Sequence, residues 1–182
     1  NHVSVEAYLN SYDWSRPWDA GAQFSSISLY NSTFKLNIED NLTDFIKLKL
    51  DYDTGSYFQK KPESTRQIIN GAMKVISGLD WLNYPIHLPE KLIDFCIDNK
   101  PEFEGCDLVD YVYVLYKCSE QTSYKKKEII NIFNNVLDYL KLLYHKEYNG
   151  FSYYINKSQT HYYGIEISKG KNTPDIHGTI LS

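Results

Sequence analysis

Two short stretches of this chain place acidic and imidazole side chains where a helix is expected to begin. Asp107 and Asp110 follow Gly105, and Asp175 and His177 open the last segment of the chain. Because Asp107 and Asp110 are three residues apart, they share one face of a helix. Two carboxylates at one site can act as general acid and base when burial raises the pKa of one of them. The residues therefore predict acid–base chemistry, with a second interpretation left open: each carboxylate only stabilises the positive end of its helix.

A third group of candidate residues lies in the segment QTHYYG, where His161 precedes Tyr162 and Tyr163. A histidine on a loop beside two tyrosines can cover a pocket and act as a base or a substrate contact. The alternative is that the two tyrosines only pack the loop onto the rest of the protein. Both interpretations remain open from the residues alone.

Several motifs that identify common enzyme classes do not occur in the sequence. There is no GxxxxGK, no GxGxxG after a predicted strand, no HExxH and no GxSxG. These absences disfavour nucleotide hydrolysis, Rossmann-type redox chemistry and serine hydrolase chemistry.

The composition narrows the class of protein further. The net charge of −4 and the lack of a long basic block disfavour binding to nucleic acid. The three cysteines show no CxxC spacing, so we expect no disulfide framework and a reduced, cytoplasmic environment. No apolar run approaches the roughly 18 to 20 residues of a membrane span. The 17 Tyr, 8 Phe and 3 Trp suit a core or an aromatic-lined cavity.

The elements that would position these residues are predicted to be helices. Apolar residues recur every three or four positions, as between Ile129 and Leu143. The segment Asp107 to Lys117 has the composition of a strand, but its apolar residues also fit one helical face, and we predict a helix. Residues 150–171 are predicted to be extended or looped. The predicted helices lie near residues 18–31, 37–51, 64–83, 89–99, 106–119, 123–148 and 174–182.

Three similar glycine junctions divide these helices into pairs. Gly55, Gly105 and Gly150 are spaced 50 and 45 residues apart in YDTGSYF, EFEGCDL and EYNGFSYY. A period of this length is typical of a repeated helical hairpin. Stacked hairpins with alternating inner and outer helices form a solenoid or a ring. We therefore predict an all-α chain of helical-hairpin repeats forming a partial α/α toroid, as one domain over residues 1–182 that is truncated at its C-terminal end.

The repeat resembles the α/α-toroid group of terpene cyclases and protein prenyltransferase β-subunits. More narrowly, GAMKVISGLDWL, EKLIDFC, GCDLVDYVYVLYKC, THYYGIEISKG and DIHGTILS are similar to an uncharacterised bacterial prenyltransferase-like family. The resemblance covers the chain from about Trp14 to its end. Two features depart from the group: the acidic DxDD motif of protonating cyclases is absent, and the turns carry Phe or Tyr in place of Gln and Trp.

The resemblance implies a zinc site, because protein prenyltransferase β-subunits bind zinc through Asp, Cys and His at the starts of inner helices. The matching residues here are Cys106, Asp110 and His177, whose side chains are donors that Zn²⁺ accepts. This chain has Cys followed directly by Asp107, whereas the family order is Asp-x-Cys. The alternative is a buried Cys106, an Asp107 that caps its helix, and a His177 that forms a hydrogen bond in the core.

In a ring, the N-termini of the inner helices converge on one mouth and create a concave, mostly aromatic pocket. The residues that we expect to bind a ligand there are Trp18, Asp19, Gln23, Arg66, Asn70, Tyr113, Tyr162 and Tyr163.

Three functional hypotheses follow from these interpretations. The first is a transferase-like or cyclase-like enzyme, or a domain derived from one, that binds an apolar or isoprenoid-like ligand in an aromatic cavity and stabilises a carbocation by cation–π attraction. The second is a glycan-active or glycan-binding toroid that uses paired carboxylates. The third is a non-catalytic scaffold whose open end recruits a partner subunit or further C-terminal hairpins.

Overall fold

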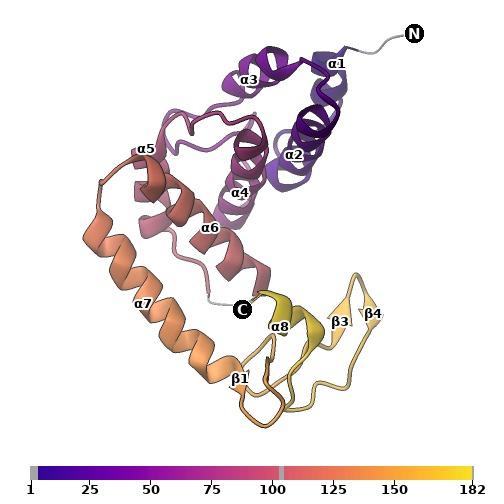
Figure 1. The fold of residues 1–182 in the computed structure, drawn as a ribbon, viewed down its shortest axis with the longest axis vertical. Coiled ribbons are helices and arrows are strands. Elements are labelled where there is room, and N and C mark those ends of the chain that lie inside the picture. The colour runs from indigo at the N-terminus through magenta and orange to yellow at the C-terminus, as the bar shows by residue number, and fades with distance from the viewer. Residues whose placement is uncertain (1–3, 103–104, 182) are drawn as a thin grey trace. The chain divides into compact units, whose positions relative to one another are not determined.

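The chain is mostly helical in a computed structural model that describes residues 4–102 and 105–181. These residues form eight helices and four strands of two residues each (Figure 1). The prediction of a helical chain is confirmed at this level, and the toroidal repeat stays a prediction. Phe103 and Glu104 of the second glycine junction lie outside the described residues.

The chain forms two compact units. Unit 1 comprises Asn1–Lys100 and Tyr113–Lys125, and unit 2 comprises Pro101–Val112 and Lys126–Ser182. The helix α6 (Gly105–Gln121) therefore contributes its first half to unit 2 and its second half to unit 1. That residues 1–182 form a single domain stays a prediction.

Local sequence signals explain where the helices of unit 1 begin. Pro17 and Pro89 occupy the first helical positions of their helices, where a missing N–H costs nothing. The Ser64 side chain accepts a hydrogen bond from the backbone N–H of Gln67 and so caps the helix that follows it. The helices of unit 1 besides the second half of α6 are α1 (Val5–Asn10), α2 (Pro17–Phe34), α3 (Glu39–Lys47), α4 (Thr65–Trp81) and α5 (Pro89–Asp98).

The helices α2 and α4 pack directly against each other in unit 1 (Figure 1). Gly71 makes this close approach possible, because a Cβ atom there would lie 2.5 Å from the Cβ of Pro17. Phe24 is fully buried, and its ring lies against Gly78 of α4. Trp14, Phe45, Leu79 and other buried residues extend this contact into one apolar core.

The second half of α6 is tied to α4 by polar contacts within unit 1. The Asp80 carboxylate accepts a 2.7 Å hydrogen bond from the Tyr113 hydroxyl. It also forms an ion pair with Lys117 at 3.0 Å. The carboxylates of Asp80 and Glu120, which both bond the Lys117 ammonium group, hold the pKa of Lys117 above its ordinary value. The predicted helix over 106–119 is confirmed, so the β-branched composition of this segment does not decide its conformation.

Unit 2 contains the first half of α6, α7 (Lys126–Leu143), two short hairpins and α8 (Ile176–Leu181). The sequence predicts a helix up to residue 148, but α7 ends at Leu143. The reason is that Tyr144–His145 forms strand β1, which pairs with β2 (Gly150–Phe151). The second hairpin pairs β3 (His161–Tyr162) with β4 (Ile165–Glu166). Its turn uses Tyr163 and Gly164, both with positive φ, as tight hairpin turns require.

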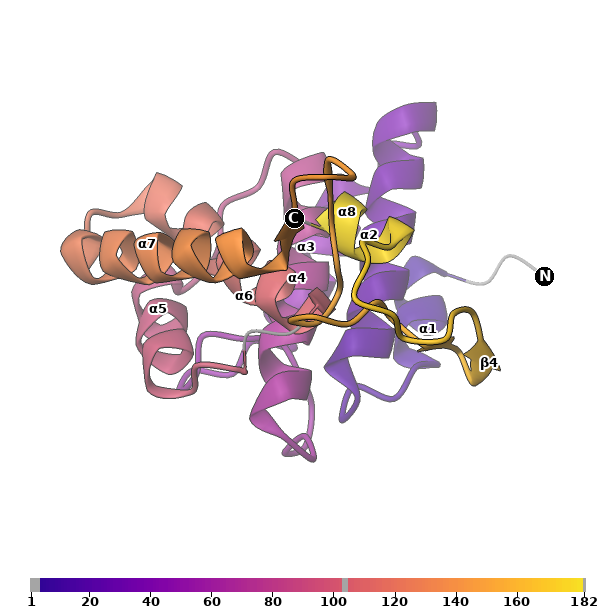
Figure 2. The ribbon, with the colours of Figure 1, turned by 90° about the horizontal axis from the view of Figure 1, so that it is seen from below.

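The helix α8 lies beside the loop that follows α7, as Figures 1 and 2 both show. It starts two residues after Pro174, where the sequence predicts the helix to open. Within the two described ranges, no helix combines the length and apolar content that are needed to cross a membrane.

Candidate functional site

The side chain of Asp175 fixes the start of α8 in unit 2. One carboxylate oxygen accepts backbone N–H bonds from Tyr153 at 2.9 Å and from Gln159 at 3.0 Å. The other oxygen accepts the N–H of Gly178 at 2.8 Å, which is the bonding pattern of a helix cap. Asp175 therefore joins two loop segments to one helix. This is the capping interpretation that the sequence leaves open, and an acid–base role for Asp175 stays a prediction.

A glycine lets α8 approach the loop that carries these N–H groups. Gly178 is buried, and a Cβ atom there would lie 2.5 Å from both the carbonyl carbon of Ser152 and the nitrogen of Tyr153. Only a residue without a side chain allows this contact. The motif DIHGT thus places the His177 side chain close to the loop, one residue before the contact point.

The first turn of α6 is shaped by a second close approach. Gly105 has a φ of +45°, and a Cβ atom there would overlap the ring and hydroxyl of Tyr153. The hydroxyl of Tyr153 accepts a 3.4 Å hydrogen bond from the backbone N–H of Cys106. Burial raises the pKa of Tyr153 to about 12, so the hydroxyl keeps its proton near neutral pH.

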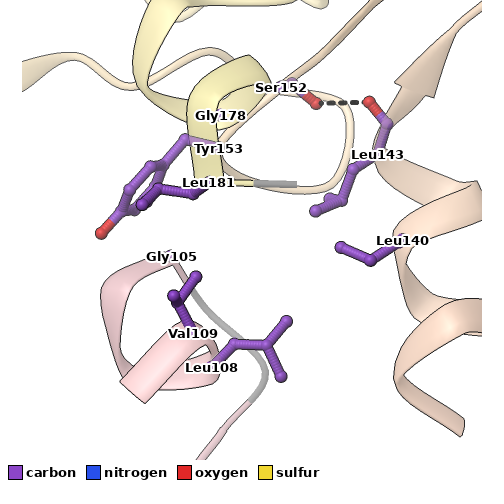
Figure 3. A pocket seen from close by; sticks show the side chains of 9 residues that line it. All are labelled: Gly105, Leu108, Val109, Leu140, Leu143, Ser152, Tyr153, Gly178 and Leu181. Atoms are coloured by element: carbon purple, nitrogen blue, oxygen red, sulfur yellow. Dashed lines mark hydrogen bonds between the residues drawn. The ribbon is translucent and has the colours of Figure 1, made fainter. Parts of the chain in front are cut away.

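A small cavity of about 20 Å³ lies beside Tyr153 (Figure 3). Tyr153 and Leu181 line one side, Leu108 and Val109 of α6 line another, and Leu140 with Leu143 of α7 lines a third. The space is large enough for one water molecule, but its walls are mostly apolar. This contact region holds the first turn of α6 against α8.

The two glycine contacts bring a thiol and an imidazole together. The Sγ atom of Cys106 lies 3.6 Å from Nε2 of His177, although the residues are 71 positions apart in the sequence. The other ring nitrogen, Nδ1, lies 2.9 Å from the side-chain oxygen of Gln159. Thiol, imidazole and amide therefore form one continuous row.

Each member of this row is supported by its surroundings. Gln159 is only 8% exposed, and its backbone carbonyl oxygen accepts a 2.7 Å hydrogen bond from the Ser168 hydroxyl. The His177 ring contacts two aromatic rings, with centroid distances of 4.9 Å to Tyr153 and 5.5 Å to Tyr162. Side chains held in this way keep one orientation, which a reactive site requires.

His177 also lines an open groove of about 470 Å³. Its apolar walls are Tyr162, Ile167, Ile176 and Ile180, and we call it the isoleucine groove. Its polar walls are Gln159, Ser168, Asp175 and His177. Ile176 is 80% exposed and Ile180 75% exposed, so the groove presents apolar surface to the solvent.

Two of the three predicted zinc ligands, Cys106 and His177, lie in contact. Within residues 4–102 and 105–181, no group of three or more His, Cys, Asp or Glu side chains is arranged to hold a metal ion. A catalytic zinc site needs three protein ligands. Zinc binding by Cys106, Asp110 and His177 therefore stays a prediction, and the contact that the structure shows is a thiol–imidazole pair.

The other predicted residues of unit 2 are placed differently. Asp110 is buried and Asp107 is half-buried in the first half of α6. His161 is exposed on β3, with Nδ1 lying 3.1 Å from the Thr160 hydroxyl oxygen, and it is not among the residues that line the isoleucine groove. Tyr163 is 89% exposed, whereas Tyr162 lines the groove. The acid–base roles of Asp107, Asp110 and His161 remain predictions.

The six remaining predicted ligand-binding residues belong to unit 1, where the structure joins two of them. The guanidinium of Arg66 lies 4.8 Å from the centre of the Trp18 ring. Asp19 instead forms an exposed 2.8 Å ion pair with Arg16. The others lie elsewhere in the unit: Gln23 accepts a hydrogen bond from Tyr8, Asn70 is buried in α4, and Tyr113 bonds Asp80. A common mouth shared with the residues of unit 2 stays a prediction.

Sequence reasoning missed Gln159 and Tyr153. Both occur in segments that the sequence singles out, since Gln159 opens QTHYYG and Tyr153 is the second-last residue of the third glycine junction, EYNGFSYY. In that segment the sequence analysis selects His161, two positions after Gln159, because a histidine can act as a base. The Gln159 side chain is a neutral amide that does not titrate, and its contact with the His177 imidazole becomes visible only in the folded chain.

Comparison with known proteins finds no matching family model, no matching curated protein and no matching solved structure.

Proposed function

We propose that this chain is a prenyltransferase-like or terpene-cyclase-like member of the helical-hairpin toroids and binds an apolar or isoprenoid-like ligand in the isoleucine groove. The observation that supports this proposal is the groove itself, whose apolar walls end at a polar group. Alternation of longer helices with shorter partners along unit 1 is compatible with such a repeat.

The size and chemistry of the groove suit a chain-like apolar ligand. Ligand pockets typically enclose about 300 to 1,000 Å³, and this groove has about 470 Å³. Burying one isoleucine side chain fully is worth about 1.5 to 3 kcal/mol, and the groove exposes three of them. His177, Gln159 and Ser168 lie where a polar head group would be recognised.

The walls differ from the aromatic cavity that the sequence predicts. Tyr162 is the only aromatic residue among those that the structure places along the groove, and the remaining apolar walls are aliphatic. The ligand would therefore be held by apolar burial more than by cation–π attraction.

The test is saturable binding of farnesol, measured by saturation-transfer NMR and by the shift in melting temperature. Ile180→Glu places a charge in the groove at an exposed position, so the chain should still fold. We expect it to weaken farnesol binding roughly tenfold or more, which corresponds to the loss of one buried isoleucine.

The matched control is Ile130→Glu on α7, since Ile130 is also exposed and does not line the groove. We expect this variant to bind farnesol like the wild type. The proposal fails if farnesol does not bind saturably, or if the two glutamate variants bind it equally.

A further inference from the structure

We infer that Cys106, His177 and Gln159 form a thiol nucleophile site that accepts an acyl group from an ester or thioester of an apolar acid. The inference rests on the proposed function in one respect: the isoleucine groove holds the apolar part of the acyl donor. It adds a covalent reaction and a class of substrate to that binding function.

The hydrogen bond to Gln159 decides which nitrogen of His177 can act as a base. An amide oxygen only accepts hydrogen bonds, so the 2.9 Å contact assigns the ring proton to Nδ1. The opposite nitrogen, Nε2, then carries a free electron pair and faces the Cys106 thiol at 3.6 Å. This is the arrangement in which an imidazole removes a proton from a thiol.

The position of Cys106 in the helix favours the same chemistry. Cys106 is the second residue of α6, a helix of 17 residues. The positive end of the helix dipole and an adjacent imidazole both stabilise a thiolate. The other two cysteines, Cys96 and Cys118, lack these surroundings because both are fully buried, and burial raises the pKa of each thiol.

A thiol nucleophile that contacts an imidazole base, which in turn bonds an orienting amide, is an arrangement typical of cysteine acyl transfer. His177 Nε2 takes the proton from Cys106, and the thiolate attacks the carbonyl carbon of the donor. A carbon–sulfur bond forms, the bond from that carbon to the leaving group breaks, and the leaving group receives the proton from Nε2. Water then attacks the S-acyl group, with His177 as base, and releases the acid and the free thiol. No electrons are gained or lost overall.

A hydrogen-bond donor for the carbonyl oxygen lies beside the thiol. The hydroxyl of Tyr153 is 3.4 Å from the backbone nitrogen of Cys106 and already accepts the N–H of that residue. Its own proton can therefore be donated to the oxygen on which negative charge develops. Tyr162 lines the groove and contacts the His177 ring, so an acyl chain in the groove would end close to the thiol.

The first test uses the wild-type chain alone. At pH 7, we expect iodoacetamide to alkylate Cys106 at least tenfold faster than free cysteine, with peptide mass spectrometry identifying the residue. Cys96 and Cys118 serve as internal controls and should stay unmodified in the folded chain. A rate equal to that of free cysteine would contradict an activated thiol.

The second test follows acyl transfer with p-nitrophenyl octanoate and p-nitrophenyl acetate. We expect a burst of one p-nitrophenolate per chain and an octanoyl group on Cys106 in the intact mass, formed at least tenfold faster than the acetyl group. Cys106→Ser should remove the burst. Absence of a burst would overturn the thiol chemistry, and equal rates for the two esters would overturn the apolar acyl donor.

Gln159 is a positioning residue, and two variants distinguish orientation from packing. Gln159→Glu keeps an oxygen that accepts the Nδ1 proton, whereas Gln159→Leu keeps the volume and loses the acceptor. If Gln159 orients the imidazole, the glutamate variant should acylate within about threefold of the wild type and the leucine variant at least tenfold more slowly. If Gln159 only packs, the buried charge should harm more than leucine, and this reversed order would contradict the proposed role.

Failure of this inference is distinct from failure of the proposed function. Farnesol binding that depends on Ile180, without acylation of Cys106, would leave the binding function intact and remove the thiol chemistry. Fast acylation of Cys106 with equal octanoyl and acetyl rates, and no farnesol binding, would show that the groove binds no apolar ligand. The reactive thiol would then be the only part of the two proposals that remains.

Discussion

The two units of this chain are stabilised in different ways. Unit 1 buries a continuous apolar core, in which Phe24, Leu42 and Ile46 are fully inaccessible and α2 packs against α4. In unit 2, hydrogen bonds to a charged side chain hold the backbone together: the Asp175 carboxylate accepts hydrogen bonds from three backbone N–H groups. Unit 2 also leaves Ile176 and Ile180 largely exposed on α8.

The candidate site lies in the unit that is held by side-chain hydrogen bonds. Segments with few buried apolar contacts open more easily than close-packed helices. The row from Cys106 to Gln159 lies in unit 2, where side-chain hydrogen bonds specify orientation. The groove in which we propose that a ligand binds also belongs to unit 2.

The largest expected effect comes from one substitution made in both cores. Leu79→Ala in unit 1 should lower the free energy of unfolding by about 4 kcal/mol, near the upper part of the range for buried leucines. Leu143→Ala in unit 2 should cost about 2 kcal/mol, because Leu143 already borders a cavity and a short loop that can relax. Hydrogen exchange of α4 and α7 amides measures each unit separately, which is needed because all three tryptophans lie in unit 1. Equal or reversed costs would remove the contrast between the units.

A smaller effect is expected when the polar anchor of unit 2 is removed. Asp175→Ala takes a charged acceptor from three backbone N–H groups and should destabilise α8 locally by roughly 2 to 3 kcal/mol. Amides of α8 and of residues 153–159 should exchange faster, whereas those of α2 and α4 should not change. Asp175→Asn, which keeps one accepting oxygen, is the matched control and should lose less. Equal exchange in wild type and the alanine variant would show that apolar contacts hold α8.

The smallest effect is a pH dependence that belongs to unit 1. Burial lowers the pKa of His87, so the folded chain binds fewer protons than the unfolded chain as the pH falls through about 6.5. The free energy of unfolding should therefore decrease on acidification from pH 7.5, until the lowered pKa of the folded state is passed. Urea unfolding at several pH values, compared between wild type and His87→Gln, isolates this contribution. A variant with the same pH slope as the wild type would contradict it.

Most of the helices could be predicted from the sequence because their signals are local. Pro17, Ser64 and Pro89 each mark a helix start through backbone geometry that involves only near neighbours. The end of α7 could not be predicted, since it depends on the pairing of Tyr144 with Phe151 across a turn. The helix α1 was not predicted, and it is only six residues long.

The candidate site could be predicted only in part. Cys106 and His177 were expected to lie together, and they do, but the expected role was zinc binding by analogy with a family. Gln159 has no charge and no motif, and its role depends on a contact across 18 residues. The three isoleucines of the groove look like core residues in the sequence, because exposure of an apolar side chain depends on the whole fold.

The long separation between Cys106 and His177 also has a consequence for synthesis of the chain. Ribosomes add roughly 5 to 20 residues per second, so His177, which is 71 positions after Cys106, is added roughly 4 to 14 seconds later. During that interval the thiol has left the point of synthesis without its imidazole partner. The acyl transfer that we propose for Cys106 would therefore begin only after α8 has docked.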